Sequence, residues 1–362
     1  MARPKRSRVV AAMSGGVDSS LAAALMQKDG YDTVGITFRM WPKEECGSSV
    51  GRTCCSLEAV TRARAVAGDL DIPYYVVDFS EDFKKEVINY FCEEYLKGLT
   101  PNPCIICNAR IKFGKLLEKA KSLGASHIAT GHYANVNFDK KTKRYLLKEG
   151  KDKAKDQSYF LFGLSQEQLA SAMFPLGGMA KEKVRLLAKK MKVRTFNTVS
   201  SQDICFVQDQ SYAEYIKKKT GVLIKPGEII DKNGKILGRH KGIPFYTIGQ
   251  RRGLGVAHKE PLYVTGIDIG KNRIIAGPRE DVMKKSLEAE RMNWIAIPSL
   301  DKPIKVKAMI RYNHRKADAI VTKTGSDSVR VDFKEAQAAP TPGQAVVFYS
   351  KDVVVGGGWI KK

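Results

Sequence analysis

About the first 210 residues alternate short apolar runs with longer segments in which apolar residues recur every three or four positions. Apolar runs of this length predict buried strands, and the longer periodicity predicts helices. The predicted strands are 8–13, 33–40, 72–79 and 126–134, and the predicted helices are 17–30, 56–70, 80–98 and 109–124. Strands separated by helices form βαβ units, so this region predicts an α/β fold with a doubly wound parallel sheet.

The pattern changes near residue 217, where helical periodicity fades and short alternating runs with Pro-Gly and Asn-Gly turns take its place. Alternating runs fill the last eighty or so residues and predict a small β-barrel or sandwich. The sequence therefore predicts three domains: an N-terminal domain (1–210), a small central domain (211–284) and a C-terminal β-barrel (285–362).

The composition is that of a globular protein, with 362 residues of which 43% are hydrophobic. The sequence contains no apolar run of about 18 residues, the length needed to cross a membrane. Its start, MARPKRSR, is basic, but the apolar run VVAAM that follows is too short for the core of a signal peptide. We expect a cytoplasmic protein without a membrane partner.

The charge is strongly unbalanced, with 62 Lys and Arg residues against 38 Asp and Glu, a formal net charge of +24. Such an excess is typical of proteins that bind a polyanion, most often nucleic acid, although a solvated basic surface is the alternative. Basic residues gather in four segments, 140–155, 189–194, 239–241 and 251–252. Because they recur in more than one predicted domain, we expect them to form one long surface that follows nucleic-acid phosphates.

The segment SGGVDSS, residues 14–20, joins the first predicted strand to the first predicted helix. Glycines allow close approach of the backbone, and successive N–H groups at a helix N-terminus form a site for anions. The lysine of a Walker loop is missing. Asp18 beside bound phosphates is suited to holding Mg²⁺. The segment therefore predicts a phosphate-binding loop that is not a Walker loop.

The chain has seven cysteines, an odd number that argues against a disulfide framework. Cys104 and Cys107 follow the rigid loop TPNP and come at the start of a predicted helix, where a thiolate is stabilised, so Cys107 is a candidate nucleophile or metal ligand. Cys205 lies in an apolar run and by itself reads as a core residue. The others have no comparable setting: Cys46, Cys54, Cys55 and Cys92.

The SGGVDS motif resembles the PP-loop of ATP pyrophosphatases, which grips the β,γ-pyrophosphate while a substrate oxygen attacks the α-phosphate. Six motifs occur in order along the chain: SGGVDSS, TPNPxxxCNxxIKFG, ATGHYA, KDQSYFLFGLS, SSQDICF and GIPFYTIGQRRGLG. Together they resemble the bacterial tRNA-specific 2-thiouridylase family over essentially the whole chain. The resemblance implies adenylation of the C2 oxygen of the wobble uridine, then replacement of this oxygen by sulfur, with ATP and Mg²⁺ as cofactors. The implied products are 2-thiouridine, AMP and pyrophosphate.

The resemblance also assigns residues to roles. The nucleotide contacts would be Ala12, Met13, Ser14, Gly15, Gly16, Val17, Asp18, Ser19, Phe38 and Gly131. Asn102, Pro103 and Cys104 would border the target base, and further tRNA contacts would be His132, Lys155, Asp156, Gln157, Arg311, Tyr312 and Gln344. Cys107 matches the family nucleophile and Cys205 the carrier of a persulfide, so a Cys107–Cys205 disulfide or released hydrosulfide would follow. The implied partners are tRNAs of the Glu, Gln and Lys type and a sulfur-donor protein, either a persulfide relay or a cysteine desulfurase.

Cys104 departs from the pattern of many relatives, which carry Asp at this place and so have Asp-x-x-Cys. The Cys-x-x-Cys form gives three thiolates, Cys104, Cys107 and Cys205, a set suited to a 4Fe-4S cluster with one open iron. Related tRNA thiolases use such a cluster to hold hydrosulfide. Zinc with a fourth ligand and a plain redox pair are the alternatives.

Two other functions remain open at the level of the sequence. Another PP-loop enzyme acting on a small molecule would need neither the Cys-x-x-Cys motif nor the basic surface. An RNA-binding or iron–sulfur carrier protein would hold ATP only as a structural ligand. Release of pyrophosphate that depends on tRNA distinguishes the thiouridylase from this carrier protein.

Overall fold

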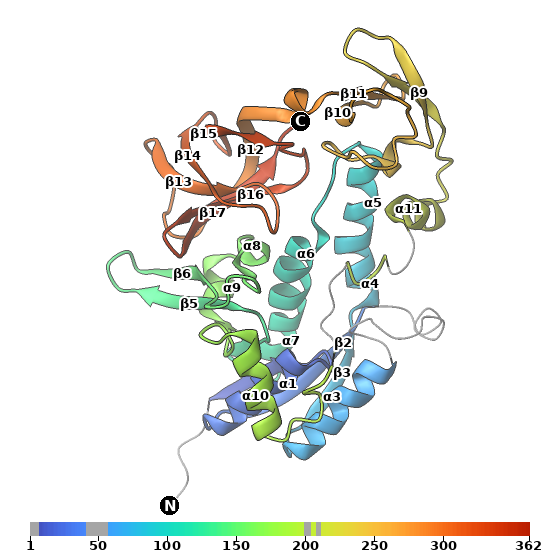
Figure 1. Cartoon of the computed structure of the whole chain (residues 1–362). Coiled ribbons are helices and arrows are strands. Elements are labelled where there is room, and N and C mark those ends of the chain that lie inside the picture. Colours follow the sequence, from blue (N-terminus) through green and yellow to red (C-terminus); the bar gives the residue numbers. More distant parts are fainter. Residues whose placement is uncertain (1–6, 41–56, 199–203, 208–210) are drawn as a thin grey trace, which may run out of the picture. The chain divides into compact units, whose positions relative to one another are not determined.

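The computed structural model describes residues 7–40, 57–198, 204–207 and 211–362. The chain forms two compact units (Figure 1). The first unit contains residues up to 87, 104–206 and 352–354, and the second contains residues 88–103, 207–351 and 355–362. No helix in the part of the chain that the structure describes is long and apolar enough to cross a membrane.

The first unit is built on a five-stranded sheet in the order β3-β2-β1-β4-β7, and every pairing in it is parallel. Its strands are β1 (Arg8–Ala12), β2 (Asp32–Arg39), β3 (Tyr74–Asp78), β4 (His127–Ala129) and β7 (Ala172–Met173). The chain winds outwards from β1 in both directions, which confirms the predicted doubly wound parallel sheet.

One buried apolar cluster joins the end of β1 to three helices. The helices are α1 (Val17–Lys28), α3 (Leu57–Asp69) and α10 (Lys181–Lys190). Leu21 of α1, Ala63 of α3 and Val184 of α10 are all fully or nearly fully buried in it. Full burial of a Leu or Val side chain contributes about 1.5–3 kcal/mol to the stability of the fold. This packing fixes the start of α10 near the start of α1 and so brings Lys181 within reach of Asp18.

The rest of the first unit consists of short elements. They are α4 (Ser80–Phe83), η1 (Lys84–Ile88), α6 (Pro103–Ile106), η2 (Cys107–Lys115), α7 (Leu116–Ser122), β5 (Ala134–Asp139), β6 (Arg144–Glu149), α8 (Ser158–Leu161) and α9 (Gln166–Ala170). The run 126–134, predicted as one strand, is divided: β4 ends at Ala129 and β5 begins at Ala134. Part of the basic segment 140–155 belongs to the β5–β6 hairpin, which the sequence did not predict. Val353 pairs with Lys148 of this hairpin.

The second unit contains a four-stranded sheet in the order β10-β11-β8-β9 and a six-stranded barrel. The first sheet and its helices are α5 (Asn89–Leu96), α11 (Tyr212–Thr220), β8 (Gly227–Ile230), β9 (Ile236–His240), η3 (Ile243–Phe245), β10 (Tyr263–Asp268), β11 (Arg273–Gly277) and η4 (Arg279–Val282). α11 begins where the Ser211 hydroxyl accepts a hydrogen bond from Glu214 N at 3.2 Å, and it ends at Gly221, whose φ is 66°.

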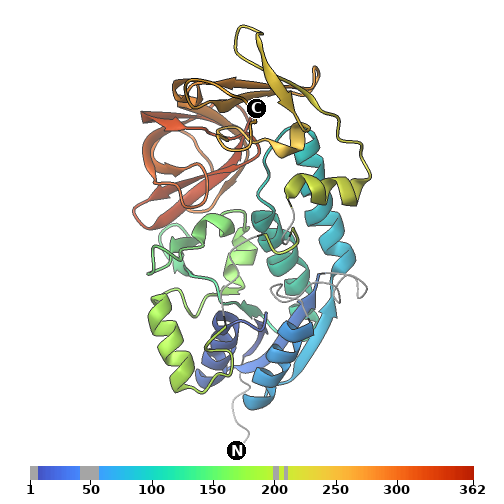
Figure 2. The ribbon, with the colours of Figure 1, turned by 45° about the vertical axis from the view of Figure 1, so that its right-hand side comes forward.

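The barrel strands are β12 (Met283–Trp294), β13 (Ile304–Met309), β14 (Ala317–Lys323), β15 (Ser328–Ala338), β16 (Ala345–Ser350) and β17 (Val353–Ile360). The barrel closes because β12 pairs antiparallel with both β15 and β17. In Figure 2 these strands, brown to red, curve around a common interior, which Val321, Val331 and Phe348 fill. The predicted C-terminal β-barrel is confirmed.

Candidate active site

The phosphate loop lies between the end of β1 and the start of α1, as the sequence predicts. Gly15 has a φ of 71°, and a Cβ atom there would lie 2.3 Å from the carbonyl oxygen of Ala59. Only glycine combines this conformation with such close contact to α3. The carbonyl of Gly15 accepts a hydrogen bond from Arg62 Nε at 3.2 Å. The loop is thus held against α3 from one side.

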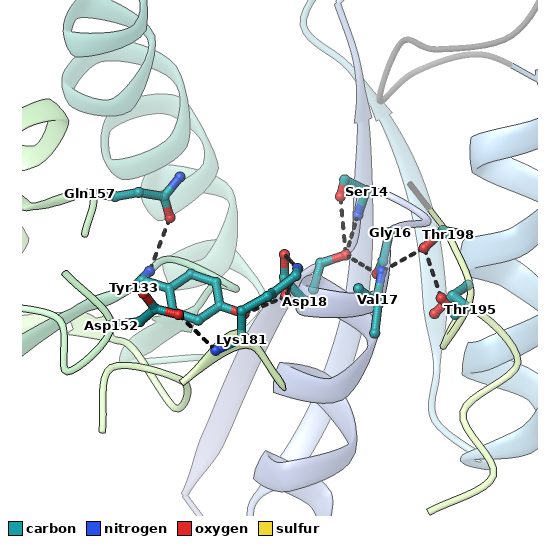
Figure 3. A network of polar contacts seen from close by, with 11 residues as sticks. Ser14, Gly16, Val17, Asp18, Tyr133, Asp152, Gln157, Lys181, Thr195 and Thr198 are labelled. Carbon is teal, nitrogen blue, oxygen red and sulfur yellow. Dashed lines mark hydrogen bonds and ion pairs between the residues drawn. The ribbon is translucent and has the colours of Figure 1, made fainter. Parts of the chain in front are cut away.

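Hydroxyl groups fix the inside of the loop. Ser14 N donates to Ser19 Oγ at 3.0 Å, and Ser19 Oγ donates to the Gly16 carbonyl at 3.1 Å. No side chain caps α1 at Gly16, and Val17 N donates to Thr198 Oγ1 at 3.1 Å (Figure 3). The turn is therefore pre-formed, with two serine hydroxyls beside the positive end of a helix, an arrangement that binds anions.

Asp18 is the charged centre of this site. It lies in the first turn of α1 and accepts hydrogen bonds from Lys181 Nζ at 2.7 and 2.6 Å and from the Tyr133 hydroxyl at 2.8 Å. Figure 3 shows Lys181 and Tyr133 both directed at this carboxylate. Burial, followed by the negative charge of Asp18, raises the pKa of Tyr133, so Tyr133 keeps its proton and donates it to this bond.

The donors around Asp18 are themselves held by hydrogen bonds. Lys181 N donates to Asp152 Oδ2 at 2.9 Å. Tyr133 N donates to Gln157 Oε1 at 3.0 Å, and Gln157 N returns a bond to the Tyr133 carbonyl at 2.9 Å. Sequence reasoning found Asp18 but missed Lys181 and Tyr133, because no local pattern brings together residues that lie 163 and 115 positions from Asp18. The one available signal was the missing Walker lysine.

The donor set fits a magnesium–nucleotide complex. Mg²⁺ is commonly bound through one or two carboxylates together with substrate phosphates, and Asp18 offers one carboxylate beside an anion-binding turn. The two predicted nucleotide contacts outside the loop have different settings. Gly131 touches α1, since a Cβ there would lie 2.7 Å from Asp18 C and 2.8 Å from Ser19 N. Phe38, on β2, lies 6.3 Å from the Phe79 ring centroid.

Cys104, Cys107 and Cys205 all belong to the first unit. Cys107 is buried, while Cys104 and Cys205 are half-buried. The helical run begins at Pro103, earlier than the sequence predicts, so Cys104 lies in its first turn and Cys107 opens the π-helical stretch η2. The expected placement of Cys107 at the helix N-terminus is therefore wrong by one turn. π-Helical turns are frequent at functional sites.

The remaining cysteine predictions have mixed outcomes. No disulfide joins the cysteines in the described parts of the chain. Within 7–40, 57–198, 204–207 and 211–362 there is no group of three His, Cys, Asp or Glu side chains placed to hold a metal ion. The three-cysteine cluster stays a prediction of the sequence. Cys92 is buried, which raises the pKa of its thiol to about 11, while Cys46, Cys54 and Cys55 lie outside the described residues.

Three family models together match almost the whole chain. Residues 7–209 match the tRNA methyl transferase HUP domain, residues 213–278 the tRNA methyl transferase PRC-barrel domain, and residues 284–360 the aminomethyltransferase beta-barrel domain. Curated relatives match over their full length. The chain is 51% identical over 357 residues to "tRNA-specific 2-thiouridylase MnmA 2" of Thermoanaerobacter sp. (strain X514), covering 98% of both chains.

Two further relatives carry the same name without the number. Identity is 48% to the protein of Acetivibrio thermocellus, covering 98% of this chain and 99% of the relative. It is 47% to that of Clostridioides difficile, covering 98% of both. The chain belongs to the tRNA-specific 2-thiouridylase family.

Several residues that the 2-thiouridylase resemblance assigned to tRNA are engaged within the protein. His132 is buried, lies 2.7 Å from Thr130 Oγ1 through Nδ1, and packs against the rings of Phe113 and Phe174, which also contact each other. Burial, and secondarily the positive charge of Lys112, holds its pKa well below the usual value, so the ring is neutral.

Residues 155–157, predicted to contact tRNA, differ in their exposure and in their hydrogen bonds within the protein. Asp156 accepts hydrogen bonds from Gly150 N at 2.8 Å and from Ser158 Oγ at 2.7 Å, and burial raises its pKa. Gln157 bonds to Tyr133 as described above. Of the three predicted contacts, Lys155 alone is exposed. The other two hold the loop after β6 in place.

The predicted contacts in the second unit lie at turns. Gln344 Nε2 donates to the Thr100 carbonyl at 2.8 Å and lies 3.4 Å from the Pro101 carbonyl. The next residues, Asn102 and Pro103, are the ones predicted to border the target base; Asn102 is half-buried and Pro103 buried. In the barrel, the predicted tRNA contacts Arg311 and Tyr312 are half-buried, and Arg311 Nη1 donates to the Ala338 carbonyl at 3.1 Å.

Proposed function

We propose that this chain is a tRNA-specific 2-thiouridylase, a sulfurtransferase that replaces the C2 oxygen of the wobble uridine with sulfur. The observation that carries this proposal is similarity over the full length: the relatives that are 51, 48 and 47% identical bear this name and match 98% of the chain. The pre-formed anion-binding turn at residues 13–19 supports an ATP-dependent reaction.

In the proposed first step, the uridine C2 oxygen attacks the α-phosphorus of ATP. The bond from the α-phosphorus to the bridging oxygen breaks, and pyrophosphate leaves with the electron pair. Ser14, Ser19 and the amides at the start of α1 orient the leaving pyrophosphate. When bound, magnesium supplies positive charge to the phosphates, and Asp18 would hold it. The adenylated oxygen is then a good leaving group at C2.

In the proposed second step, sulfur displaces this group. The terminal sulfur of a Cys205 persulfide attacks C2, the C2–O bond breaks, and AMP leaves. The Cys107 thiolate then attacks the Cys205 Sγ, which releases 2-thiouridine and forms a Cys107–Cys205 disulfide. A thiol reductant returns both residues to thiols for the next cycle. In the alternative, Cys107 first releases hydrosulfide from the persulfide, and hydrosulfide attacks C2.

An iron–sulfur route is the further alternative. A 4Fe-4S cluster held by Cys104, Cys107 and Cys205 would present an open iron to hydrosulfide. The described residues contain no group of three His, Cys, Asp or Glu side chains placed to hold a metal ion. The Cys-x-x-Cys spacing remains its support.

The proposed partners are tRNAs of the Glu, Gln and Lys type and a protein that delivers persulfide sulfur. The net charge of +24 supports a polyanionic substrate. We assign catalysis to residues 1–210, tRNA binding to the central domain (211–284) and further tRNA contacts to the barrel (285–362). Of the proposed contacts, Lys155 is exposed and Asn102 is half-buried.

The test is pyrophosphate release and 2-thiouridine formation by the full chain with ATP, tRNA of the Glu type and a persulfide donor. Pyrophosphate should appear only when tRNA is present, and Cys205→Ser and Cys107→Ser should abolish 2-thiouridine. Cys92→Ala, which removes a buried cysteine that no proposed step uses, is the control. Pyrophosphate release without tRNA favours the small-molecule enzyme. Tight tRNA binding without any release favours the carrier protein.

A second variant separates the two sulfur routes. Cys104→Asp restores the Asp-x-x-Cys pattern of other family members and removes one cluster ligand. On the persulfide route it keeps thiolation, and anaerobic protein carries no iron. Loss of thiolation in Cys104→Asp, together with about four irons per wild-type chain, would show the cluster route instead.

A further inference from the structure

The phosphate loop lacks a cation of its own. Walker loops contain a lysine that reaches the β- and γ-phosphates, but residues 14–20 contain none. Two basic side chains contact this loop or its first helical turn in the described structure. Arg62 donates to the Gly15 carbonyl. Lys181 contacts the Asp18 carboxylate, at the end of the site where Asp18 would hold magnesium.

Lys181 is a placed side chain rather than a mobile surface lysine. Its side chain is 12% exposed, and its backbone N–H is fixed on Asp152. Its Nζ lies 5.7 Å from the centroid of the Tyr133 ring, within the range of a cation–π contact. Val184, one turn further along α10, is fully buried in the cluster shared with α1. Packing of the helix therefore fixes the backbone from which this side chain reaches Asp18.

We propose that Lys181 is the exchangeable cation of the phosphate loop. Without nucleotide, Lys181 forms an ion pair with Asp18. When Mg·ATP binds, the Lys181 side chain moves so that its ammonium group leaves Asp18 and contacts the β- and γ-phosphates, while Asp18 binds the magnesium ion. This inference rests on the ATP-dependent function proposed above. It adds a phosphate-binding residue to that reaction and makes Lys181 a competitor of Mg²⁺ for one carboxylate.

The charges explain why an exchange suits this site. A bare Asp18 carboxylate would repel phosphates entering the turn, whereas the Asp18–Lys181 pair is neutral. Lysine is a compact point charge on a flexible stem of four carbons, so its head can move while α10 stays packed. Each ion pair that breaks is replaced by another, Asp18 with the metal and Lys181 with phosphate. A purely structural salt bridge would show no such exchange.

Two binding measurements on the same variant test the proposal, because it predicts effects of opposite sign. In Lys181→Met, affinity for Mg·ATP and for pyrophosphate should fall about tenfold or more, since charge-assisted bonds to phosphate are lost. Affinity for Mn²⁺ alone, followed by electron paramagnetic resonance, should rise because Asp18 has lost its competitor. Affinity for AMP should change by less than about twofold.

Lys183→Met is the matched control, because it removes an exposed lysine two positions along the same helix. It should leave all four affinities unchanged. Lys181→Arg, which keeps the charge, should retain most of the Mg·ATP affinity even if Lys181→Met fails to fold. The proposal is overturned if Lys181→Met leaves Mg·ATP affinity unchanged, or if Mn²⁺ affinity falls with it. In case Lys181→Met does not fold, Lys181→Gln takes its place with the same expectations.

Failure of the proposed function is a separate outcome. If wild-type protein binds Mg·ATP through Lys181 but forms no 2-thiouridine, the exchange stands and the tRNA reaction does not. If it forms 2-thiouridine while Lys181→Met binds Mg·ATP normally, the function stands and the exchange fails.

Discussion

At the scale of single residues, burial and hydrogen bonding give neighbouring polar groups of the site different settings. The carboxylate oxygens of Asp18 accept hydrogen bonds from Lys181 and Tyr133. His132 precedes Tyr133 in the loop between β4 and β5. It is buried against aromatic rings and stays neutral. The loop between β4 and β5 therefore contains two adjacent residues with different roles. Tyr133 donates to Asp18 at the phosphate loop, and His132 is a neutral part of the core.

The neutral state of His132 predicts a pH dependence of stability. Its folded pKa lies below the unfolded value of about 6.5, so the unfolded chain binds a proton that the folded chain does not. Its contribution is present above about pH 6.5 and is lost as the pH falls towards the folded pKa. The free energy of unfolding should decline by up to about 1.4 kcal/mol per pH unit in that window.

The measurement is urea unfolding of wild type and His132→Gln between pH 7.5 and 5, with about 0.5-unit steps. The difference between the two proteins should shrink as the pH falls. His258→Gln, at an exposed site, is the control. A wild-type minus His132→Gln difference that stays constant over this range would contradict the prediction.

At the scale of elements, the barrel turn at residues 342–344 holds the loop that leads to the predicted base site. Thr100 N donates to the Pro342 carbonyl at 2.9 Å, and Gln344 Nε2 donates to the Thr100 carbonyl at 2.8 Å. Gly343 has a φ of 88°, and a Cβ there would lie 2.9 Å from Thr100 N. The turn can approach the backbone of Thr100 this closely only because residue 343 is a glycine.

This contact predicts that Gln344 acts through the loop. Gln344→Leu removes the donor to the Thr100 carbonyl, and Gln344→Glu places a carboxylate against that carbonyl oxygen. Each should lower the thiolation rate constant by about fivefold or more, which corresponds to a hydrogen bond of about 1 kcal/mol. Affinity for tRNA should fall by less. The measurement is single-turnover thiolation alongside tRNA binding.

Gln337→Leu is the matched control, since Gln337 Nε2 donates to the Glu335 carbonyl at 2.7 Å on the barrel itself. It should leave both quantities near the wild-type values. If Gln344→Leu weakened tRNA binding as much as it slowed thiolation, Gln344 would instead be a direct tRNA contact.

At the scale of the whole molecule, the sequence predicted what local patterns encode. The alternation of apolar runs and helices gave the parallel sheet, and the SGGVDSS segment placed Asp18 and Ser19 at the start of α1. It did not predict Lys181, because that contact depends on how α10 packs against α1. Nor did it predict the burial of His132, which comes from Phe113 and Phe174 in distant segments.

The net charge of +24 is also a property of the whole molecule, and it predicts how tRNA binding depends on salt. Each phosphate contact releases counterions, so affinity falls steeply as salt rises. Between about 50 and 200 mM salt, tRNA affinity should fall by about a hundredfold or more, as expected for several phosphate contacts. Affinity for Mg·ATP, which concerns one small site, should change far less. Equilibrium binding of both ligands across this series measures the effect.

Reversal of charge in one basic segment localises the contacts. Lys153 and Lys155 are both exposed on the same loop, and Lys153 pairs with Glu149 at 3.0 Å. Lys155→Glu should weaken tRNA binding and make the salt slope shallower by about one unit or more, because a phosphate contact is lost. Lys362→Glu, at the last residue, is a control with the same change in net charge. Equal effects of the two variants would mean that the basic surface acts through bulk charge and that Lys155 makes no phosphate contact of its own.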